Sequence, residues 1–306
     1  MGRVLFIFLD GVGIGPRDPD KNPFFQSELP TLSRLLGGGI PHLKAPEHSS
    51  QDSICFPLDP LLGVEGLPQS GTGHTAILTG ENGPALYGRH FGPWVPVRLR
   101  PVVVDRNVLS RAQAQGFRCA FANAYPKEFH GSPWARRPAG PPLAAMAAGL
   151  LTREGEALKQ GQALSSEIVN TAWRDHLKYE DLPEVTPQAA GRNLASITAE
   201  ADLTFFAHYA TDYAGHRGRM EGAVHALERV DAFLKGVLDH LPQDTLLVIG
   251  SDHGNLEDVT SGHTLNPAFT LLSGPGAHRL REGRSRLTDL PGLILEALTD
   301  GMPAPT

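Results

Sequence analysis

Four short runs of apolar residues occur along the chain without polar alternation, which is typical of strands buried on both faces of a parallel sheet. They cover residues 4–9, 203–207, 245–249 and 268–272. A fifth run, residues 118–122, follows a helical stretch at 107–115 that ends at Gly116, as a helix C-cap would. Helices alternating with strands predict an α/β fold with a mainly parallel central sheet flanked by helices.

Two further helices are predicted from the spacing of apolar positions. Within residues 220–238 these positions recur every three or four residues, which places them on one stripe of a helix. The last helix is expected at residues 290–298, with Thr288 and Asp289 as possible N-caps.

Residues 83–105 and 124–190 do not follow the alternation of helices and strands. The first segment is rich in Gly, Pro and aromatic residues, and the second is Pro-rich and helical with no evident strand. Because neither has an apolar inventory of its own, we expect one domain, residues 1–306, with both segments inserted as small lids over one face of the sheet.

Composition narrows the classes of protein. Of 306 residues, 41% are hydrophobic and 20% charged, which is globular composition, and no apolar run is long enough to span a bilayer. The net charge of -6 argues against nucleic acid or an anionic membrane as a partner. With Cys55 and Cys119 as the two cysteines and no signal-peptide pattern, we expect a cytoplasmic protein without disulfides, and the oligomeric state stays open.

Potential metal ligands follow or precede these apolar runs. In open α/β sheets ligands bind beyond the carboxyl ends of the strands. Any one such residue could be a turn former or a hydrogen-bonded side chain, but six at strand ends favour a metal site. Carboxylates with imidazoles suit Zn²⁺ or Mn²⁺, and the absence of clustered Cys argues against structural zinc or iron-sulfur sites. The six residues are Asp10, Asp212, His216, Asp252, His253 and His263.

A serine motif supplies a candidate nucleophile. The segment from Gln69 to His74 reads Gln-Ser-Gly-Thr-Gly-His, and residues 75–79 after it are compatible with a helix. The glycines permit a tight turn and close approach to an anion, and the helix would point its N-terminus at Ser70. The same segment could be a polar loop with an N-cap, whereas beside a cation the Ser70 hydroxyl would be a strong nucleophile.

The order of these motifs resembles the metalloenzyme branch of the alkaline phosphatase superfamily, in particular cofactor-independent phosphoglycerate mutase and phosphopentomutase. The resemblance runs from residue 4 to about residue 270. It covers a first-strand Asp, Ser-x-x-Gly-His, Asp-x-x-x-His, Asp-His-Gly-Asn and His-Thr motifs. In this chain they fall at Asp10, at Ser70 with Gly73 and His74, at Asp212 with His216, at Asp252 to Asn255, and at His263 with Thr264.

The resemblance implies two divalent metal ions, Mn²⁺ or Zn²⁺ with Mg²⁺ possible. One ion would be held by Asp10, Ser70, Asp252 and His253, and the other by Asp212, His216 and His263. It also implies a small phosphorylated substrate, whose phosphoryl group Ser70 would accept as phosphoserine before water or a second hydroxyl takes it.

The chain departs from these mutases in one respect, because each of them carries a large cap domain between the nucleophile and the Asp-x-x-x-His motif. Here only 142 positions separate Ser70 from Asp212, and much of that length is needed for core elements. A small lid makes it harder to hold an intermediate away from water, so we favour a phosphatase over the alternative, a mutase. The candidate substrate-binding residues are His74, Arg89, His90, Arg98 and Arg217.

Three other classes of protein are weaker interpretations. Residues 55–59 approach the sulfatase pattern Cys-x-Pro-x-Arg, but Asp59 replaces the arginine and Ser70 occupies the place of the nucleophile. Gly11, Gly13 and Gly15 follow a strand, yet prolines follow them instead of a helix, so the dinucleotide fingerprint fails. A non-catalytic metal-binding protein would leave the intact serine motif unexplained.

Overall fold

The central sheet of the computed structural model has seven strands in the order β2-β3-β7-β6-β1-β5-β4. The structure describes residues 2–217 and 219–300, without the side chains of residues 130 and 134. The strands are β1 (Arg3–Leu9), β2 (His48–Ser49), β3 (Ser53–Leu58), β4 (Cys119–Phe121), β5 (Leu203–His208), β6 (Thr245–Gly250) and β7 (Ala268–Ser273).

All five predicted strands are present, and the sheet is parallel at its centre. β1 pairs in parallel with β5 and β6, and β4 pairs in parallel with β5. β7 corrects the expectation of a parallel strand, because it runs antiparallel to β6, with Gly250 opposite Thr270. The start of β7 therefore lies at the sheet edge where β1, β5 and β6 end.

The sequence did not predict β2 and β3. β3 pairs antiparallel with β7, and β2 with β3, so these two strands complete one side of the sheet. Pro57 in β3 has no backbone N–H to donate to a ladder, which disguises the strand.

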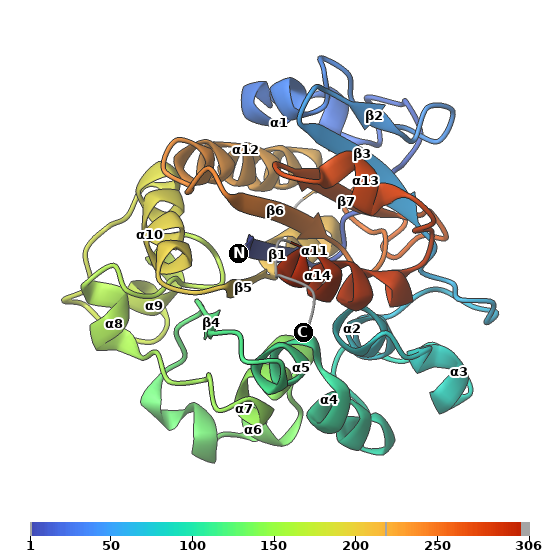
Figure 1. The fold of residues 1–306 in the computed structure, drawn as a ribbon. Coiled ribbons are helices and arrows are strands. Elements are labelled where there is room, and N and C mark those ends of the chain that lie inside the picture. The colour runs from blue at the N-terminus through green and yellow to red at the C-terminus, as the bar shows by residue number, and fades with distance from the viewer. Residues whose placement is uncertain (1, 218, 301–306) are drawn as a thin grey trace.

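Helices cover both faces of the sheet (Figure 1). Val4, Phe6 and Phe8 of β1 face a core shared with α2, α5, α7 and α14, whereas Leu5, Ile7 and Leu9 face α1, α10 and α12. The α-helices are α1 (Pro30–Leu35), α2 (Ser70–Thr79), α3 (Gly83–Tyr87), α4 (Arg100–Arg106), α5 (Val108–Ala114), α6 (Pro133–Arg136), α7 (Gly140–Ala147), α8 (Gly155–Lys159), α9 (Thr171–Asp175), α10 (Pro187–Ala199), α11 (Ala210–Arg217), α12 (Arg219–Leu238), α13 (Ala277–Arg281) and α14 (Leu290–Thr299).

The three helices expected from the sequence outside the serine motif are confirmed as α5, α12 and α14. Asn107 caps α5 by accepting a hydrogen bond from Ser110 N at 2.9 Å, and Gly116 adopts a left-handed φ of 89° after it. Asp289 does not cap α14, because its carboxylate accepts from the backbone N–H groups of Ser285 and Arg286 instead.

The two irregular segments take part in packing. Residues 83–105 contain α3 and most of α4. In residues 124–190, Leu143, Ala144 and Ala145 of α7 join the main core, which places α7 beside α2 and α5. A small separate cluster includes Trp173 and Leu182, so this segment has an apolar inventory of its own, contrary to expectation.

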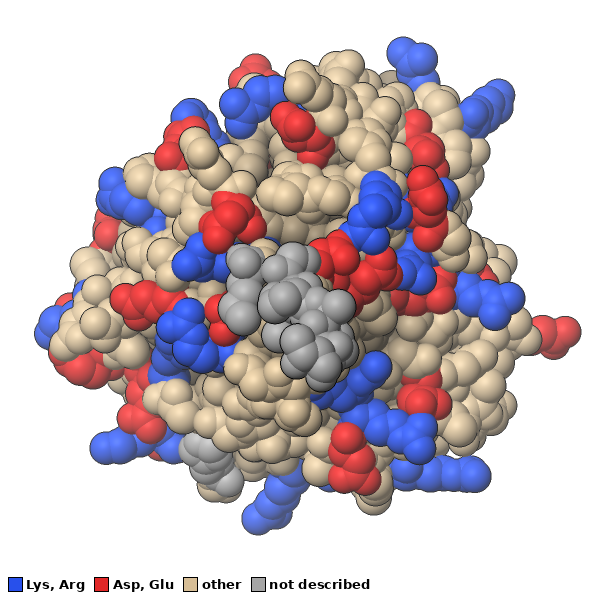
Figure 2. All heavy atoms as spheres, viewed as in Figure 1, with Lys and Arg blue, Asp and Glu red and all other residues tan. Residues whose placement is uncertain are grey.

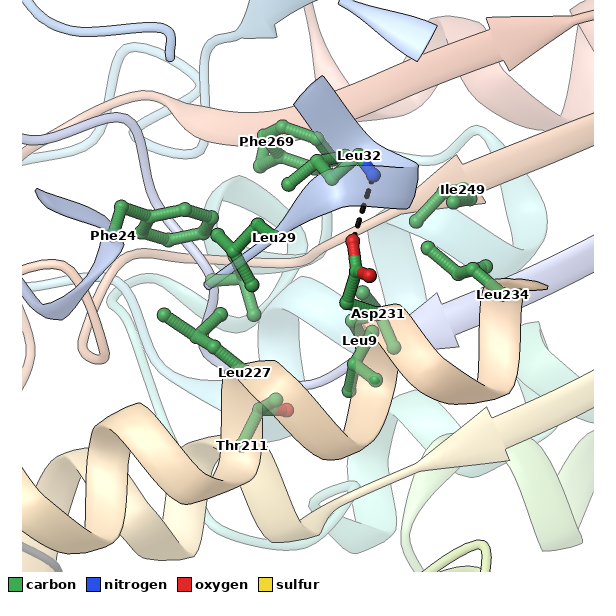
Figure 3. A pocket seen from close by; sticks show the side chains of 12 residues that line it. Leu9, Phe24, Leu29, Leu32, Thr211, Leu227, Asp231, Leu234, Ile249 and Phe269 are labelled. Carbon is green, nitrogen blue, oxygen red and sulfur yellow. Dashed lines mark hydrogen bonds between the residues drawn. The ribbon is translucent and has the colours of Figure 1, made fainter. Parts of the chain in front are cut away.

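A buried carboxylate joins α12 to α1 across the chain. Asp231 of α12 accepts hydrogen bonds from Thr31 N at 3.1 Å and Leu32 N at 2.7 Å, at the start of α1. Figure 3 shows Asp231 beside apolar side chains that line a pocket, including Leu9 at the end of β1. The first turn of α1 is thereby held against the sheet end that carries Asp10.

Charges of both signs are interspersed on the face shown in Figure 2. Among the described residues, no helix is both long enough and apolar enough to cross a membrane.

Candidate metal centre and nucleophile

Three buried side chains form a first group of potential ligands, here called the closed cluster: Asp10, Asp252 and His253. Asp10 follows β1, and the other two follow the neighbouring strand β6. His253 Nε2 lies 3.5 Å from Asp10 Oδ1 and 3.4 Å from Asp252 Oδ2. These carboxylate oxygens have no hydrogen-bond partner among the described residues. Buried acceptors without donors are costly, so this group fits a divalent cation.

The two carboxyl groups of the closed cluster affect each other's ionisation. Burial raises the pKa of Asp252 well above its usual value, and the negative charge of Asp10 acts in the same direction. Burial also raises the pKa of Asp10, but His74 and His253 outweigh it and the net pKa is lowered. Without a cation, one proton therefore tends to reside on Asp252.

A second group, here called the open cluster, contains Asp212, His216 and His263. His216 Nε2 lies 3.5 Å from Asp212 Oδ2 and 3.1 Å from His263 Nε2, and His263 Nε2 lies 3.6 Å from Asp212 Oδ1. The His216 side chain is 42% exposed and that of Asp212 19%, whereas Asp252 and His253 are inaccessible to solvent. Among the described candidate ligands, those of the open cluster are therefore more accessible to solvent than those of the closed cluster.

The backbone brings His263 to the same place as the ligands that follow parallel strands. His263 precedes β7, and because β7 is antiparallel, its first residue lies at the carboxyl edge of β1 and β6. Gly254 forms an antiparallel bridge with Thr264, which draws the two loops together. The rings of His253 and His263 stand 4.0 Å apart between centroids.

Hydrogen bonds orient two of the histidines as metal ligands. His263 Nδ1 lies 2.7 Å from Pro68 O, and His253 Nδ1 lies 3.3 Å from Gly254 O. A carbonyl oxygen only accepts, so each Nδ1 carries the hydrogen and each Nε2 offers its lone pair toward the site. Burial lowers the pKa of His263 to about 4, with the charges of His253 and His216 in the same direction, so the ring is neutral at pH 7.

Ser70 stands beside the closed cluster, with its Oγ 3.1 Å from His253 Nε2. It is the first residue of α2, where the positive end of the helix dipole favours an anion. Thr72 N donates to Phe91 O at 2.9 Å, and a Cβ at Gly71 would overlap Trp94 O, so residues 91–94 wrap the start of this helix. The serine motif therefore begins a helix rather than a loop.

His74, a candidate substrate residue, lies behind the carboxylates and is only 1% exposed. Its Nδ1 accepts a hydrogen bond from Gly140 N at 3.2 Å, and its Nε2 faces Asp10 and Asp252. Both ring nitrogens thus face protein atoms, which corrects the expectation of substrate contact.

The structure does not bring the other four candidate substrate residues into the site. Arg89, Arg98 and Arg217 are exposed, and His90 Nε2 lies 3.1 Å from Val64 O. Arg217 stacks on Tyr213, 5.6 Å from the ring centroid. No hydrogen bond or ion pair joins any of the four to the two clusters or Ser70 within residues 2–217 and 219–300.

Glu257 is a site residue that the sequence analysis missed. Its buried carboxylate accepts hydrogen bonds from Gly13 N at 2.9 Å and Asn255 N at 2.8 Å, and from the side chains of Thr264 and Asn266. It therefore joins the loops that carry Asp10, Asp252 and His263. Its position two residues after Asp-His-Gly-Asn was the available signal.

The weaker interpretations find no support in the positions of their residues. Cys55 lies inside β3, and burial raises the pKa of its thiol, so it is not a reactive nucleophile. Gly13 and Gly15 pack against Glu257 rather than leaving room for a phosphate.

Part of the chain is similar to a family of metalloenzymes. The Metalloenzyme superfamily profile matches residues 177–299, a range that holds the open cluster, Asp252 and His253. The 2,3-bisphosphoglycerate-independent phosphoglycerate mutase of Ruegeria pomeroyi is 34% identical over 138 residues, 42% of this chain and 26% of the relative. That of Acetivibrio thermocellus is 36% identical over 108 residues, 32% of this chain and 21% of the relative. These matches span about a quarter of the relatives' length.

Solved structures share the fold over the whole chain. A protein from Pyrococcus horikoshii superposes with a TM-score of 0.61 at 15% identity, covering 100% of this chain and 99% of that one. The alkaline phosphatase of the Antarctic bacterium TAB5 gives a TM-score of 0.56 at 14% identity, covering 97% of each chain. The chain therefore has an alkaline phosphatase-like fold, its residues 177–299 match the Metalloenzyme superfamily, and about 40% of its length is similar to part of the 2,3-bisphosphoglycerate-independent phosphoglycerate mutases.

Proposed function

We propose that the protein is a metal-dependent phosphohydrolase that acts on a small phosphate ester, with Ser70 as nucleophile. The observation that carries the proposal is the contact between Ser70 Oγ and His253 Nε2, 3.1 Å apart, beside buried carboxylate oxygens that lack donors. The superfamily match supports the expectation of divalent ions, Mn²⁺ or Zn²⁺ with Mg²⁺ possible. The ligand atoms of the closed cluster lie close enough together to hold one ion, and so do those of Asp212 and His263 together with His253.

The reaction would proceed in two displacements at phosphorus. Ser70 Oγ forms a bond to phosphorus while the bond from phosphorus to the ester oxygen breaks, and the serine proton ends on the released alcohol. Water then attacks the phosphoserine, which breaks the bond to Ser70 Oγ and releases phosphate. When bound, the cations would neutralise the charge of the phosphoryl group and favour the serine alkoxide. The start of α2 adds the positive end of its dipole.

Hydrolysis is favoured over mutase activity by the exposure of the open cluster. Because the His216 side chain is 42% exposed, solvent reaches the open cluster, and we expect water to attack the phosphoserine from that side. A mutase must keep its phosphoenzyme away from water until the second hydroxyl arrives. We propose that residues 83–105 and 124–190 act as lids of a single cytoplasmic domain and are too small for that task.

A phosphosugar or phosphoglycerate-type mutase is the second candidate. The observation that favours it is the 34% identity to a named phosphoglycerate mutase over 138 residues. In that case the acceptor of the phosphoryl group would be a second hydroxyl of the substrate.

A metal-reconstituted substrate screen distinguishes the two candidates. Phosphomonoesters, phosphodiesters and sugar phosphates are incubated with the chain and Mn²⁺, Zn²⁺ or Mg²⁺, and both free phosphate and isomerised product are measured. We expect released phosphate. Quantitative isomerisation without phosphate release would establish the mutase instead, and no turnover with any metal would refute phosphoryl transfer.

A further inference from the structure

We propose that His74 is a positioning residue for the closed cluster, and that α7 of the 124–190 segment fixes it in the required tautomer. The proposal rests on the metal centre put forward above, but its test measures metal binding and does not depend on turnover. Under this proposal α7 helps to position a residue of the metal centre and does not act only as a lid over it.

The tautomer of His74 follows from its partner on α7. Gly140 N is a donor, so His74 Nδ1 must accept the hydrogen bond, 3.2 Å long, and cannot carry a hydrogen. The hydrogen of the neutral ring is therefore on Nε2. This arrangement is the opposite of that in His253 and His263, whose Nδ1 atoms donate to carbonyl oxygens. His74 thus has no lone pair to offer a cation, and its Nε2–H is a buried donor that makes no hydrogen bond with the described residues.

The donor faces both carboxylates of the closed cluster. His74 Nε2 lies 3.5 Å from Asp10 Oδ2 and 3.4 Å from Asp252 Oδ2, and the ring is buried against Phe8, 5.1 Å between centroids. Asp10 Oδ2 is not the oxygen that faces His253, so a hydrogen bond from His74 would leave Asp10 Oδ1 free for a cation. A group that holds a ligand by its other oxygen fixes its orientation and strengthens metal binding.

Close packing leaves His74 little freedom to move. A Cβ at Gly140 would overlap His74 Cβ and approach Leu78 Cδ1, so only glycine lets α7 come this near to α2. Leu143, Ala144 and Ala145 then anchor α7 in the core. The position of α7 therefore sets the position of the donor.

Two substitutions separate the donor from the packing. His74→Asn keeps an acceptor for Gly140 N but is too short to present a donor to the carboxylates, whereas His74→Gln can place an amide N–H where Nε2 stood. His208→Asn is the control, because His208 is an equally buried histidine whose Nδ1 lies 2.8 Å from Ser166 O and which forms no ion pair with the described carboxylates. Circular dichroism establishes that each variant is folded.

Calorimetric titration with Mn²⁺ measures the affinity of the two clusters, and metal analysis after dialysis measures how many ions stay bound. We expect the unmodified chain to bind two ions. His74→Asn should lower the affinity for one of them by about 10- to 100-fold. The affinities of His74→Gln and His208→Asn should stay within a few-fold of those of the unmodified chain. Wild-type affinity in His74→Asn, or equal losses in the Asn and Gln variants, would overturn the proposal. Failure of the unmodified chain to bind Mn²⁺ would refute the metal centre itself, whereas two bound ions without turnover would count only against the phosphohydrolase.

Discussion

The two ligand clusters beside Ser70 differ in how far solvent reaches them. In the closed cluster Asp252 and His253 are fully buried and Asp10 nearly so. His74 lies behind these carboxylates and is also buried. In the open cluster His216 is 42% exposed. From this difference we expect a division of roles under the proposed function, in which the closed cluster holds the nucleophile in place and the open cluster meets substrate and water.

The largest expected effect comes from removing the hydroxyl of Ser70, which stands beside the closed cluster. Ser70→Ala should lower kcat on the phosphate ester found by the screen by about 10⁴-fold or more, because no phosphoserine can form. Mass spectrometry of acid-quenched enzyme should find phosphate on Ser70 in the unmodified chain and none in the variant. Unchanged kcat in a folded Ser70→Ala chain would mean that water attacks the ester directly.

Removing one carboxylate from each cluster tests their independence. Asp252→Asn should lower the affinity of the closed cluster for its ion by more than about 100-fold and should leave the other ion bound. This loss exceeds the usual effect of substituting a residue that only supports a ligand. Asp212→Asn should do the reverse. Calorimetric titration with Mn²⁺ measures both constants, and loss of both ions in either variant would show that the clusters form a single site.

Glu257→Gln tests the support that the two clusters share. A glutamine cannot accept hydrogen bonds at both ends of its side chain, so at least one buried donor loses its partner. We expect the free energy of unfolding, measured with urea, to fall by about 1–3 kcal/mol. A change near zero would indicate that the loops are held by their other contacts.

The smallest expected effect is a difference in how the clusters respond to pH. Protonation competes with a cation, and burial together with the charge of Asp10 raises the pKa of Asp252 well above its usual value. In the open cluster the pKa of Asp212 is also raised by burial, but less, and His263 stays neutral down to about pH 4.

As the pH falls, protonation of Asp252 should therefore weaken binding of the ion in the closed cluster. Its affinity should change by up to about tenfold per pH unit, because one proton is displaced on binding. Metal analysis after dialysis across a pH series measures the loss of bound ion, and a metal content that does not change as the pH falls would contradict this account.

The sequence predicted the sheet centre and suggested the candidate ligands because both depend on local patterns. Continuous apolar runs identify buried strands, and Asp10, Asp252 and His253 follow such runs directly. The direction of β7 could not be read this way, because an apolar run of six residues looks the same in either direction. That direction matters, since a parallel β7 would place His263 at the opposite edge of the sheet.

The supporting residues were harder to foresee. Glu257, His74 and Gly140 act through contacts with residues far away in the chain. The motif before Glu257 draws attention to it, but the neighbouring sequence does not show that its carboxylate is buried or that Gly140 touches His74. The exposed cations Arg89, Arg98 and Arg217 show the converse, because residue type alone does not reveal where a side chain points.

The central claim is that the two clusters hold a pair of cations beside Ser70. The direct measurement is a crystal structure of the chain soaked in Mn²⁺, with anomalous scattering recorded to locate the ions. We predict two anomalous peaks, one coordinated by Asp10, Asp252 and His253 and one by Asp212, His216 and His263, with Ser70 Oγ beside them. A single peak, or peaks away from these side chains, would contradict the account.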